Sequence, residues 1–414
     1  MVSRRVLAGA MLVAALCADA RPAAAQTADD LFNDQALQRI DLWVNTRDWH
    51  LLRASPESGE RYPANLRWNG QTVTNVALRV RGTGSLSAAK PALRVDFDTY
   101  ATGRTFLGLK TISLRNSYQD PSGLRELLTM KTYRSMGLPA SRMAPVALYV
   151  NNTYFGYYIV TEEVDEPFLA RVYGENTGYL FEYRWNSYYY MEYLGSDLGA
   201  YATIYDPRTR ETESQGSLYV PVEAMIRTIN QASDADFVPA VSAYLDFTAF
   251  MRLVAAQAAI AECDGLLGNW GVNNHYLYRM NARSLHQFIP WDASSSLRAL
   301  DYPLHAGHDE NVLMRRAMAV PPLTQIYYDA LLEAADLFDS PDAAAAEPSP
   351  GWLERETTRL LDLVRPAMYA DQVKPYTNDE FEAGAAEVVT FAQFRGEVVR
   401  WEARRFKTGG RPVY

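Results

Sequence analysis

Cysteine and histidine are scarce in this sequence, with two and five residues among 414. Cys17 lies in the N-terminal segment, so a chain processed there would keep Cys263 alone. A lone cysteine forms no internal disulfide, which excludes a disulfide-stapled fold. Cys263 ends the apolar run AFMRLVAAQAAIAEC, where a small buried side chain is favoured over the alternative of a nucleophile.

The sequence beyond its N-terminal segment also lacks long apolar runs and an excess of basic residues. No later stretch reaches the roughly 18 uninterrupted apolar residues of a membrane helix. Lys and Arg number 40 against 49 Asp and Glu, which gives a formal net charge of −9. Because nucleic-acid binding needs a basic face, these counts argue against that class of partner and are compatible with cation binding.

The first 25 residues have the pattern of a secretory signal peptide. A start with two arginines precedes the apolar stretch VLAGAMLVAAL, and small residues lead to an expected cleavage after Ala25. We therefore predict an exported protein, periplasmic or extracellular, with no membrane span after cleavage. An uncleaved anchor is one alternative. A lipoprotein attached through Cys17 is another, although Leu16 stands where a small residue is needed.

A strand-rich first part is followed by a helix-rich remainder. From about residue 36 to 165, period-two alternation appears in IDLWV, LRWNG, TVTNVALRVRG, ALRVDFD, TISLRN and VALYVNNTYFGYYIVTEEVD. One helix, predicted in DPSGLRELLTMKTYRSMG, interrupts these strands. From about residue 166, helical patterns dominate around a further hairpin. We expect an α+β fold with a β-rich domain over 26–165 and a mainly helical domain over 166–414.

Three oxygen-bearing side chains are predicted to meet after the apolar run. The run is expected to end near Cys263, and Asp264 follows in a loop rich in glycine and asparagine. The strands HYLYRM and LHQFIPWD flank a turn near residue 283, so residue 274 faces 291 or 292. Asn274 and Asp292 then lie side by side where the loop from Asp264 arrives. Such oxygens suit a hard divalent cation, for example Mg²⁺.

Each of these three residues has an ordinary structural explanation when taken alone. Asp264 fits a loop residue that accepts backbone N–H groups, and Asn274 fits a turn former. Asp292 fits a cap ahead of three serines. Only their joint placement favours a functional site.

Five motifs in one order resemble the spore coat protein H (CotH) kinase-like family, a branch of atypical protein kinases. They cover most of residues 75–300 and read VALRVRGTGSLSAAKPALRVDFD, LRNSYQDPSGLRELLTMKTYRSMGLPA, LYVNNTYFGYYIVTEEVDEPFL, CDGLL…NNHYLY and FIPWD. The resemblance implies an atypical protein-kinase-like two-lobed fold. Its β-rich N-lobe would carry one helix of the αC type, and its C-lobe would be mainly helical.

The resemblance also implies a phosphate-binding loop in the N-lobe, with an ordinary hairpin turn as the alternative. Its residues are Arg81, Gly82, Thr83, Gly84 and Ser85. Lys90 would contact phosphate as a point charge, with Arg94 as a competing candidate. Glu126 would orient Lys90, unless it is an ordinary solvated charge of a helix.

Further roles implied by the resemblance lie in the hinge and the C-lobe. Backbone groups near Glu163 and Val164 would meet a purine ring, and Asp264 would be the catalytic base. Asp292 would be the main metal ligand. Asn274 is preferred as the second metal ligand because it stands at a strand start, whereas Asn269 has the kinase-like interval from the aspartate.

The activity implied is transfer of the ATP γ-phosphoryl group, with Mg²⁺ or Mn²⁺, to Ser or Thr hydroxyls of secreted or envelope proteins. Two departures stand against this. Ser294 replaces a second aspartate that family members often have, and the loop between Asp264 and Asn274 is longer than usual. They motivate the alternative of a weak or inactive kinase-fold protein that acts in envelope or surface assembly or binding. A metal-dependent hydrolase is a third option.

Overall fold

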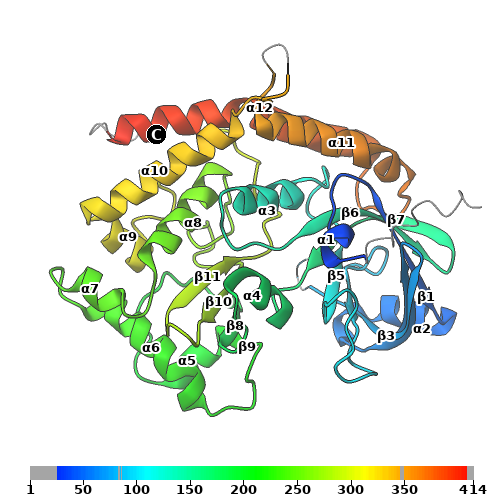
Figure 1. The fold of residues 1–414 in the computed structure, drawn as a ribbon, viewed down its shortest axis with the longest axis horizontal. Coiled ribbons are helices and arrows are strands. Elements are labelled where there is room, and N and C mark those ends of the chain that lie inside the picture. Colours follow the sequence, from blue (N-terminus) through cyan, green and yellow to red (C-terminus); the bar gives the residue numbers. More distant parts are fainter. Residues whose placement is uncertain (1–25, 83, 85, 346–348, 408–414) are drawn as a thin grey trace, which may run out of the picture.

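The fold combines a β-barrel with a helical part that contains a second, smaller sheet (Figure 1). The structure, a computed structural model, describes residues 26–82, 84, 86–345 and 349–407. The predicted signal peptide, residues 1–25, lies outside them. The predicted α+β class is confirmed.

Seven strands form the barrel. They are β1 (Gln38–Val44), β2 (Tyr62–Trp68), β3 (Gln71–Val80), β4 (Leu93–Asp96), β5 (Thr111–Arg115), β6 (Met143–Val150) and β7 (Thr153–Glu162). Their order around the ring is β1-β2-β3-β4-β5-β7-β6, and β1 closes it by pairing in parallel with β6. Alternate residues such as Ile40, Leu78 and Val146 fill the interior. The strands were predicted, but the closed ring was not, because alternation does not identify a strand's neighbours.

The turn between β6 and β7 matches its prediction. Asn151 and Asn152 have φ angles of 49° and 67°. Both central residues of a type I′ hairpin turn need positive φ, and asparagine tolerates it. The Asn-Asn pair therefore fixes the register of β6 on β7.

The barrel region contains more helix than the sequence analysis predicted. Besides α3 (Arg125–Ser135), which was expected, it has α1 (Ala28–Leu31), α2 (Thr46–Ala54) and a 3₁₀ turn over Pro56–Ser58. The prediction of a single interrupting helix is therefore wrong. The side chain of Asn45 caps α2 by accepting a hydrogen bond from the Arg47 amide, a signal that a local reading could have used.

The second sheet has four strands in the order β11-β10-β8-β9. These are β8 (Tyr179–Tyr183), β9 (Tyr205–Pro207), β10 (His275–Arg279) and β11 (His286–Pro290). The hairpin of β10 and β11 was predicted, and its register is confirmed because His275 pairs with Pro290. The addition of β8 and β9 was not predicted.

Helices make up most of the rest. They are α4 (Glu166–Tyr173), α5 (Leu198–Ala202), α6 (Gln215–Gln231), α7 (Phe237–Val241), α8 (Phe247–Ala259), α9 (Val312–Met318), α10 (Pro321–Phe338), α11 (Trp352–Ala370) and α12 (Asn378–Lys407). In Figure 1, α11 and α12 run along one side of the molecule, and α3 lies between the barrel and the helical part. None of the described helices combines the length and apolarity needed to span a membrane.

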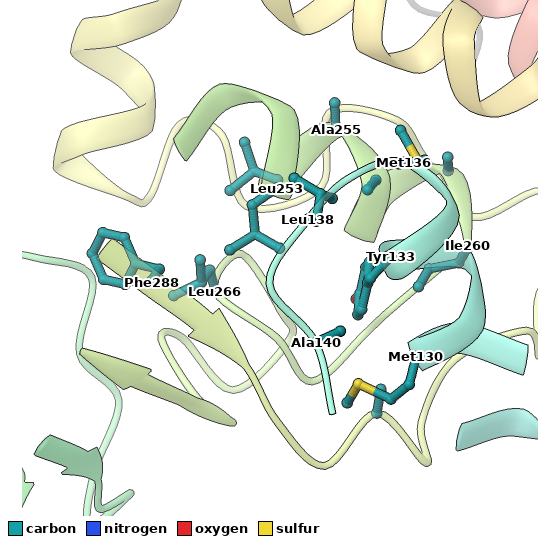
Figure 2. Close-up of a cluster of buried hydrophobic side chains, with 14 of the residues drawn as sticks. Met130, Tyr133, Met136, Leu138, Ala140, Leu253, Ala255, Ile260, Leu266 and Phe288 are labelled. Atoms are coloured by element: carbon teal, nitrogen blue, oxygen red, sulfur yellow. The ribbon is translucent and has the colours of Figure 1, made fainter. Parts of the chain in front are cut away.

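The core joins α3, α8 and the hairpin of β10 and β11. Figure 2 shows Tyr133 of α3 near Ile260, and Leu266 near Phe288 of β11. Leu266 belongs to the loop after α8, so this loop is anchored in the core. α8 ends at Ala259, earlier than the predicted end near Cys263, and Ala261 has a φ of 55°.

Candidate functional site

The loop from Asp264 to Asn274 folds back on its own start. The Asn269 amide donates to the Cys263 carbonyl at 2.8 Å. At Gly268 a Cβ atom would lie 2.6 Å from the Cys263 carbonyl oxygen and 2.7 Å from Asp264 Cα. The loop therefore needs glycine at this position, because any side chain would push Gly268 away from the backbone of Cys263 and Asp264.

This fold brings two asparagines to the Asp264 carboxylate. Asn273 Nδ2 donates to Oδ1 at 2.8 Å, and Asn274 Nδ2 donates to Oδ2 at 3.0 Å and to the Asp264 carbonyl at 3.0 Å. Asn269 is exposed, and its backbone amide closes the loop. The preference for Asn274 over Asn269 as a metal ligand stays a prediction. Asn273 was missed, because turn asparagines look alike in sequence.

The hairpin of β10 and β11 places Asp292 beside this loop. Trp291 donates its backbone N–H to the Asn274 carbonyl at 2.9 Å, so Asp292 follows directly where the strands open. Its φ is 47° and its side chain is 42% exposed. Burial raises the pKa of Asp264, and the nearby charge of Asp292 raises it further. The predicted neighbourhood of Asp264, Asn274 and Asp292 is confirmed.

A buried carboxylate lies behind Asp264. Glu262 accepts the Asp264 amide through Oε1 at 3.0 Å, and among the described residues its Oε2 has no hydrogen-bond partner. Burial, together with the charges of Asp264 and Asp292, raises the pKa of Glu262 to about 8. At neutral pH Glu262 is therefore mostly protonated, and Asp264 and Asp292 carry the negative charge that a cation would relieve.

The donor set fits Mg²⁺ or Mn²⁺. Asp292 and Asn274 offer oxygen ligands, and Mg²⁺ usually takes one or two carboxylates and completes its shell with water and substrate phosphates. In the described part of the chain, no group of three or more His, Cys, Asp or Glu side chains is arranged to hold a metal by itself. A metal ion held here would therefore need further ligands from water or from a bound phosphate.

The predicted pairing of Lys90 with Glu126 is wrong. Lys90 is fully buried, and its Nζ lies 2.7 Å from Asp371 Oδ2. The same oxygen accepts the Tyr157 amide at 2.9 Å. Burial lowers the pKa of Lys90, and only Asp371 opposes this strongly. Lys90 thus joins the barrel to the segment after α11, and it is absent from the lining of the pocket that Arg115 borders.

The partner of Glu126 is Arg115, at the end of β5. Arg115 Nε donates to Glu126 Oε2 at 2.6 Å, and its Nη2 lies 2.7 Å from Asp292 Oδ1. Burial raises the pKa of Glu126 to about 7, although Arg115 lowers it. Glu126 is thus neither the partner of Lys90 nor a solvated helix charge, the two roles considered for it, but the buried partner of Arg115. Arg115 was missed because it was assigned only to a strand, and it meets Asp292 from far along the chain.

Arg115 lines a small pocket between the barrel and the loop after β11. The pocket has a volume of about 60 Å³. Its charged or polar lining includes Arg81, Arg115, Glu126, Asp292 and Ser294. A pocket of this size is far below the 300–1,000 Å³ or so of typical ligand sites. A nucleotide would therefore occupy it only in part, unless the two sides separate.

The predicted phosphate-binding loop borders this pocket in part. Arg81 and Gly82 line it, and Gly82 has a φ of 92°. Gly84 lies near Gln119, since a Cβ there would be 3.5 Å from Nε2. Thr83 and Ser85 lie outside the described residues.

The predicted hinge residues are both buried. Glu163 accepts Arg81 Nη1 at 3.1 Å and Arg94 Nη1 at 3.2 Å. Burial alone would raise the pKa of Glu163, but the charges of the two arginines outweigh this effect and lower the pKa to about 2. Arg94, the competing phosphate candidate, is thus held by Glu163 and Asp96 on the outer face of β4. Val164 packs in an apolar cluster with Trp291, and the expected contact with a purine stays a prediction.

The segment after Asp292 is fastened to α3. Arg125, almost fully buried, donates through Nη1 to the carbonyls of Ser296 and Leu297 at 3.1 and 2.5 Å. The hydroxyls of Thr129 and Ser296 lie 2.5 Å apart. Since α3 also carries Glu126, one helix positions both ends of the Glu126–Arg115–Asp292 chain.

Comparisons with known proteins agree with the motifs. Inner spore coat protein H of Bacillus subtilis (strain 168) is 24% identical over 262 residues, which cover 63% of this chain and 69% of that protein. The crystal structure of the Helicobacter pylori proinflammatory kinase CtkA matches 76% of this chain and 95% of that chain, with 9% identity and a TM-score of 0.29. A structural likeness at that level carries no argument about fold or activity.

The family assignment comes from a sequence profile described as CotH kinase protein, which matches residues 78–399. This range is well over half of the chain and contains Arg115, Glu126, Asp264 and Asp292. The resemblance inferred from the motifs is confirmed, and the chain belongs to the CotH kinase protein family.

Proposed function

We propose that this protein is an exported kinase that transfers the γ-phosphoryl group of ATP to a Ser or Thr hydroxyl of a secreted or envelope protein. The observation that carries the proposal is the contact of the Asp264 loop with the tip of the β10–β11 hairpin, which sets Asp264, Asn274 and Asp292 together. Membership of the family supports a kinase-like function.

Asp264 is the proposed catalytic base. The amides of Asn273 and Asn274 bond its two carboxylate oxygens and so fix the plane of the group. Burial and Asp292 raise its pKa, which makes it a better proton acceptor for the attacking hydroxyl than an exposed aspartate. Its side chain remains partly exposed, so a substrate hydroxyl could reach it.

Asp292 and Asn274 are the proposed ligands of Mg²⁺ or Mn²⁺. The metal ion would neutralise charge on the nucleotide phosphates. Arg81 and the backbone of Gly82 border the same pocket and would help to hold the anionic phosphates there.

Substitution of Asp292 tests this proposal. Asp292→Asn should reduce transfer of labelled phosphate, to itself or to a generic acceptor, by more than the roughly 10- to 100-fold typical of residues that only orient a metal ligand. Asp301→Asn serves as a matched control, because Asp301 is an exposed aspartate of the same segment. Equal labelling by wild type and Asp292→Asn would remove Asp292 from the reaction.

The second candidate is a binding or assembly protein with the same fold. Ser294, the small pocket and the ion pair between Arg115 and Asp292 favour it. Thermal unfolding with ATP plus Mg²⁺ separates the two candidates. A kinase should gain several degrees in Tm at saturating nucleotide, since a ligand that binds only the folded state stabilises it. An unchanged Tm with every nucleotide–metal pair would favour the binding protein.

A further inference from the structure

Arg115 contacts two of the three carboxylates that line the pocket. It reaches Glu126 on α3 and Asp292 after β11, from the end of a barrel strand. Its side chain is 12% exposed, and its guanidinium lies 5.3 Å from the ring of Trp291. The two carboxylates raise its pKa, so the cation is permanent. The residue is thus held as a fixed positive charge at the pocket.

The contacts of Arg115 leave binding capacity unused. The Nη2 atom is close to Asp292 Oδ1, yet within the described ranges it makes no aligned hydrogen bond. The same is true of Oε1 of Glu126. Both residues line the pocket. A buried N–H without an aligned acceptor is costly, and an incoming anionic oxygen would satisfy it.

The ion pair with Arg115 also competes with a metal ion. Asp292 Oδ1 is the atom at 2.7 Å from the guanidinium, and Asp292 is the proposed main metal ligand. A divalent cation close to that oxygen would repel Arg115, since like charges a few ångströms apart in a poorly solvated site interact strongly. A triphosphate would offer Arg115 new acceptors.

We propose that Arg115, rather than Lys90, binds the nucleotide phosphates, and that a nucleotide–metal complex replaces its ion pair with Asp292. The proposal rests on the proposed function. Arg115 keeps Nε on Glu126 while Nη2 passes from Asp292 to a phosphate oxygen, and Asp292 becomes free for the metal ion. In the absence of nucleotide, the same ion pair opposes metal binding.

Arg115→Met should change two affinities in opposite directions. Binding of Mn²⁺ alone, measured by titration calorimetry, should become at least threefold tighter because Asp292 loses its cation. Binding of the non-hydrolysable analogue adenylyl imidodiphosphate at saturating Mn²⁺ should become at least tenfold weaker. Arg400→Met is the matched control, since Arg400 on α12 also bridges two carboxylates, Asp336 and Asp339, but does not line the pocket. It should change neither affinity.

Arg115→Lys keeps the inference testable if Arg115→Met does not fold. A single ammonium cannot contact Glu126 and Asp292 with two separate nitrogens, so the same opposite changes should appear at smaller size. Folded variants at Arg115 that bind Mn²⁺ alone like wild type, and bind the analogue within twofold of it, would overturn the inference.

The outcomes separate this inference from the kinase proposal. Nucleotide binding that depends on Arg115, without any transfer of label, would contradict the kinase and support the role of Arg115. Transfer of label by wild type, with unchanged nucleotide affinity in a folded Arg115 variant, would contradict only the role of Arg115. Absence of any nucleotide binding by wild type would contradict both.

Discussion

Lys90 is a buried cation whose charge depends on one carboxylate. Its side chain has no exposed surface, and Asp371 lies 2.7 Å away, itself 1% exposed. A buried ion pair adds little net stability, but removal of one partner leaves an uncompensated charge in the interior. The residue therefore matters for folding and lies apart from the proposed nucleotide contacts.

Lys90→Met should lower the free energy of unfolding by about 3–5 kcal/mol, because Asp371 is left buried and charged. Chemical denaturation measures this. Lys90→Met combined with Asp371→Asn should recover part of the loss, since the pair is then neutral and the amide oxygen can still accept the Tyr157 N–H. The gain in Tm caused by nucleotide and Mg²⁺ should persist in the double variant. If nucleotide and Mg²⁺ no longer raised the Tm of the double variant, Lys90 would have to take part in nucleotide binding.

Sequence reasoning found the acidic partner on α3 but not the cation that it holds. Lys90 and Arg115 both stand near strand ends, and both residue types bind phosphate. Which of them meets Glu126 depends on the order of strands in the ring and on where α11 ends. The strand order and the end of α11 cannot be predicted from a local sequence pattern. The proximity of Asp264, Asn274 and Asp292 can be, because it depends on one loop and one hairpin.

At the scale of elements, the loop over residues 264–274 is the part most sensitive to a single added carbon. Gly268→Ala would place Cβ against the backbone of Cys263 and Asp264. We expect the loop to open, which moves the asparagines off Asp264. A displacement of about 1 Å can cost roughly a hundredfold in rate, so kcat should fall by about that factor.

The matched control for the loop is Gly216→Ala in the first turn of α6. There Cβ would meet only Ser214 Oγ, at 3.7 Å, and alanine favours helix. This variant should keep kcat and gain about 0.5–1 kcal/mol in stability. If Gly268→Ala and Gly216→Ala have the same kcat in a phosphate-transfer assay, the close packing of the loop has no role in catalysis.

The same scale shows how far local patterns reach. The β10–β11 register could be predicted because a four-residue turn and alternating burial define it. The end of α8 could not be predicted, because the apolar residues Ile260 and Ala261 continue the pattern beyond the last helical residue, Ala259. Because α8 ends at Ala259, Glu262 lies in the following turn, where its buried carboxyl group accepts the Asp264 amide. This contact depends on the tertiary structure and has no signal in the sequence.

At the scale of the whole molecule, several buried histidines make stability depend on pH. Burial lowers the pKa of His286 to about 4, of His305 to about 4 and of His308 to about 3. A histidine in an unfolded chain titrates near 6.5. Their stabilising contribution is therefore complete above pH 6.5 and is lost as the pH falls toward 4. Glu126 and Glu262, with raised pKa values, act in the opposite sense.

Because these terms oppose one another, the informative quantity is a difference between variants. When the pH falls from 7.5 to 5, the free energy of unfolding of His286→Gln should rise relative to that of the wild type by about 2 kcal/mol. Each pKa unit corresponds to about 1.4 kcal/mol. Urea unfolding at both pH values measures it. His50→Gln, at an exposed position, should show no such gain. A difference independent of pH would mean that the pKa of His286 is the same in the folded and the unfolded chain, so that its burial does not disfavour the protonated form.

The closed barrel has a consequence for the order in which the protein can assemble. Its first strand pairs with β2 early, but its other edge waits for β6, since Gln38 meets Val146. Nearly all of the barrel sequence must therefore be synthesised before β1 can pair with β6 and close the ring. Until then one edge of β1 has unpaired backbone N–H and C=O groups. The partly formed barrel can therefore pair with strands of other chains until this late step is complete.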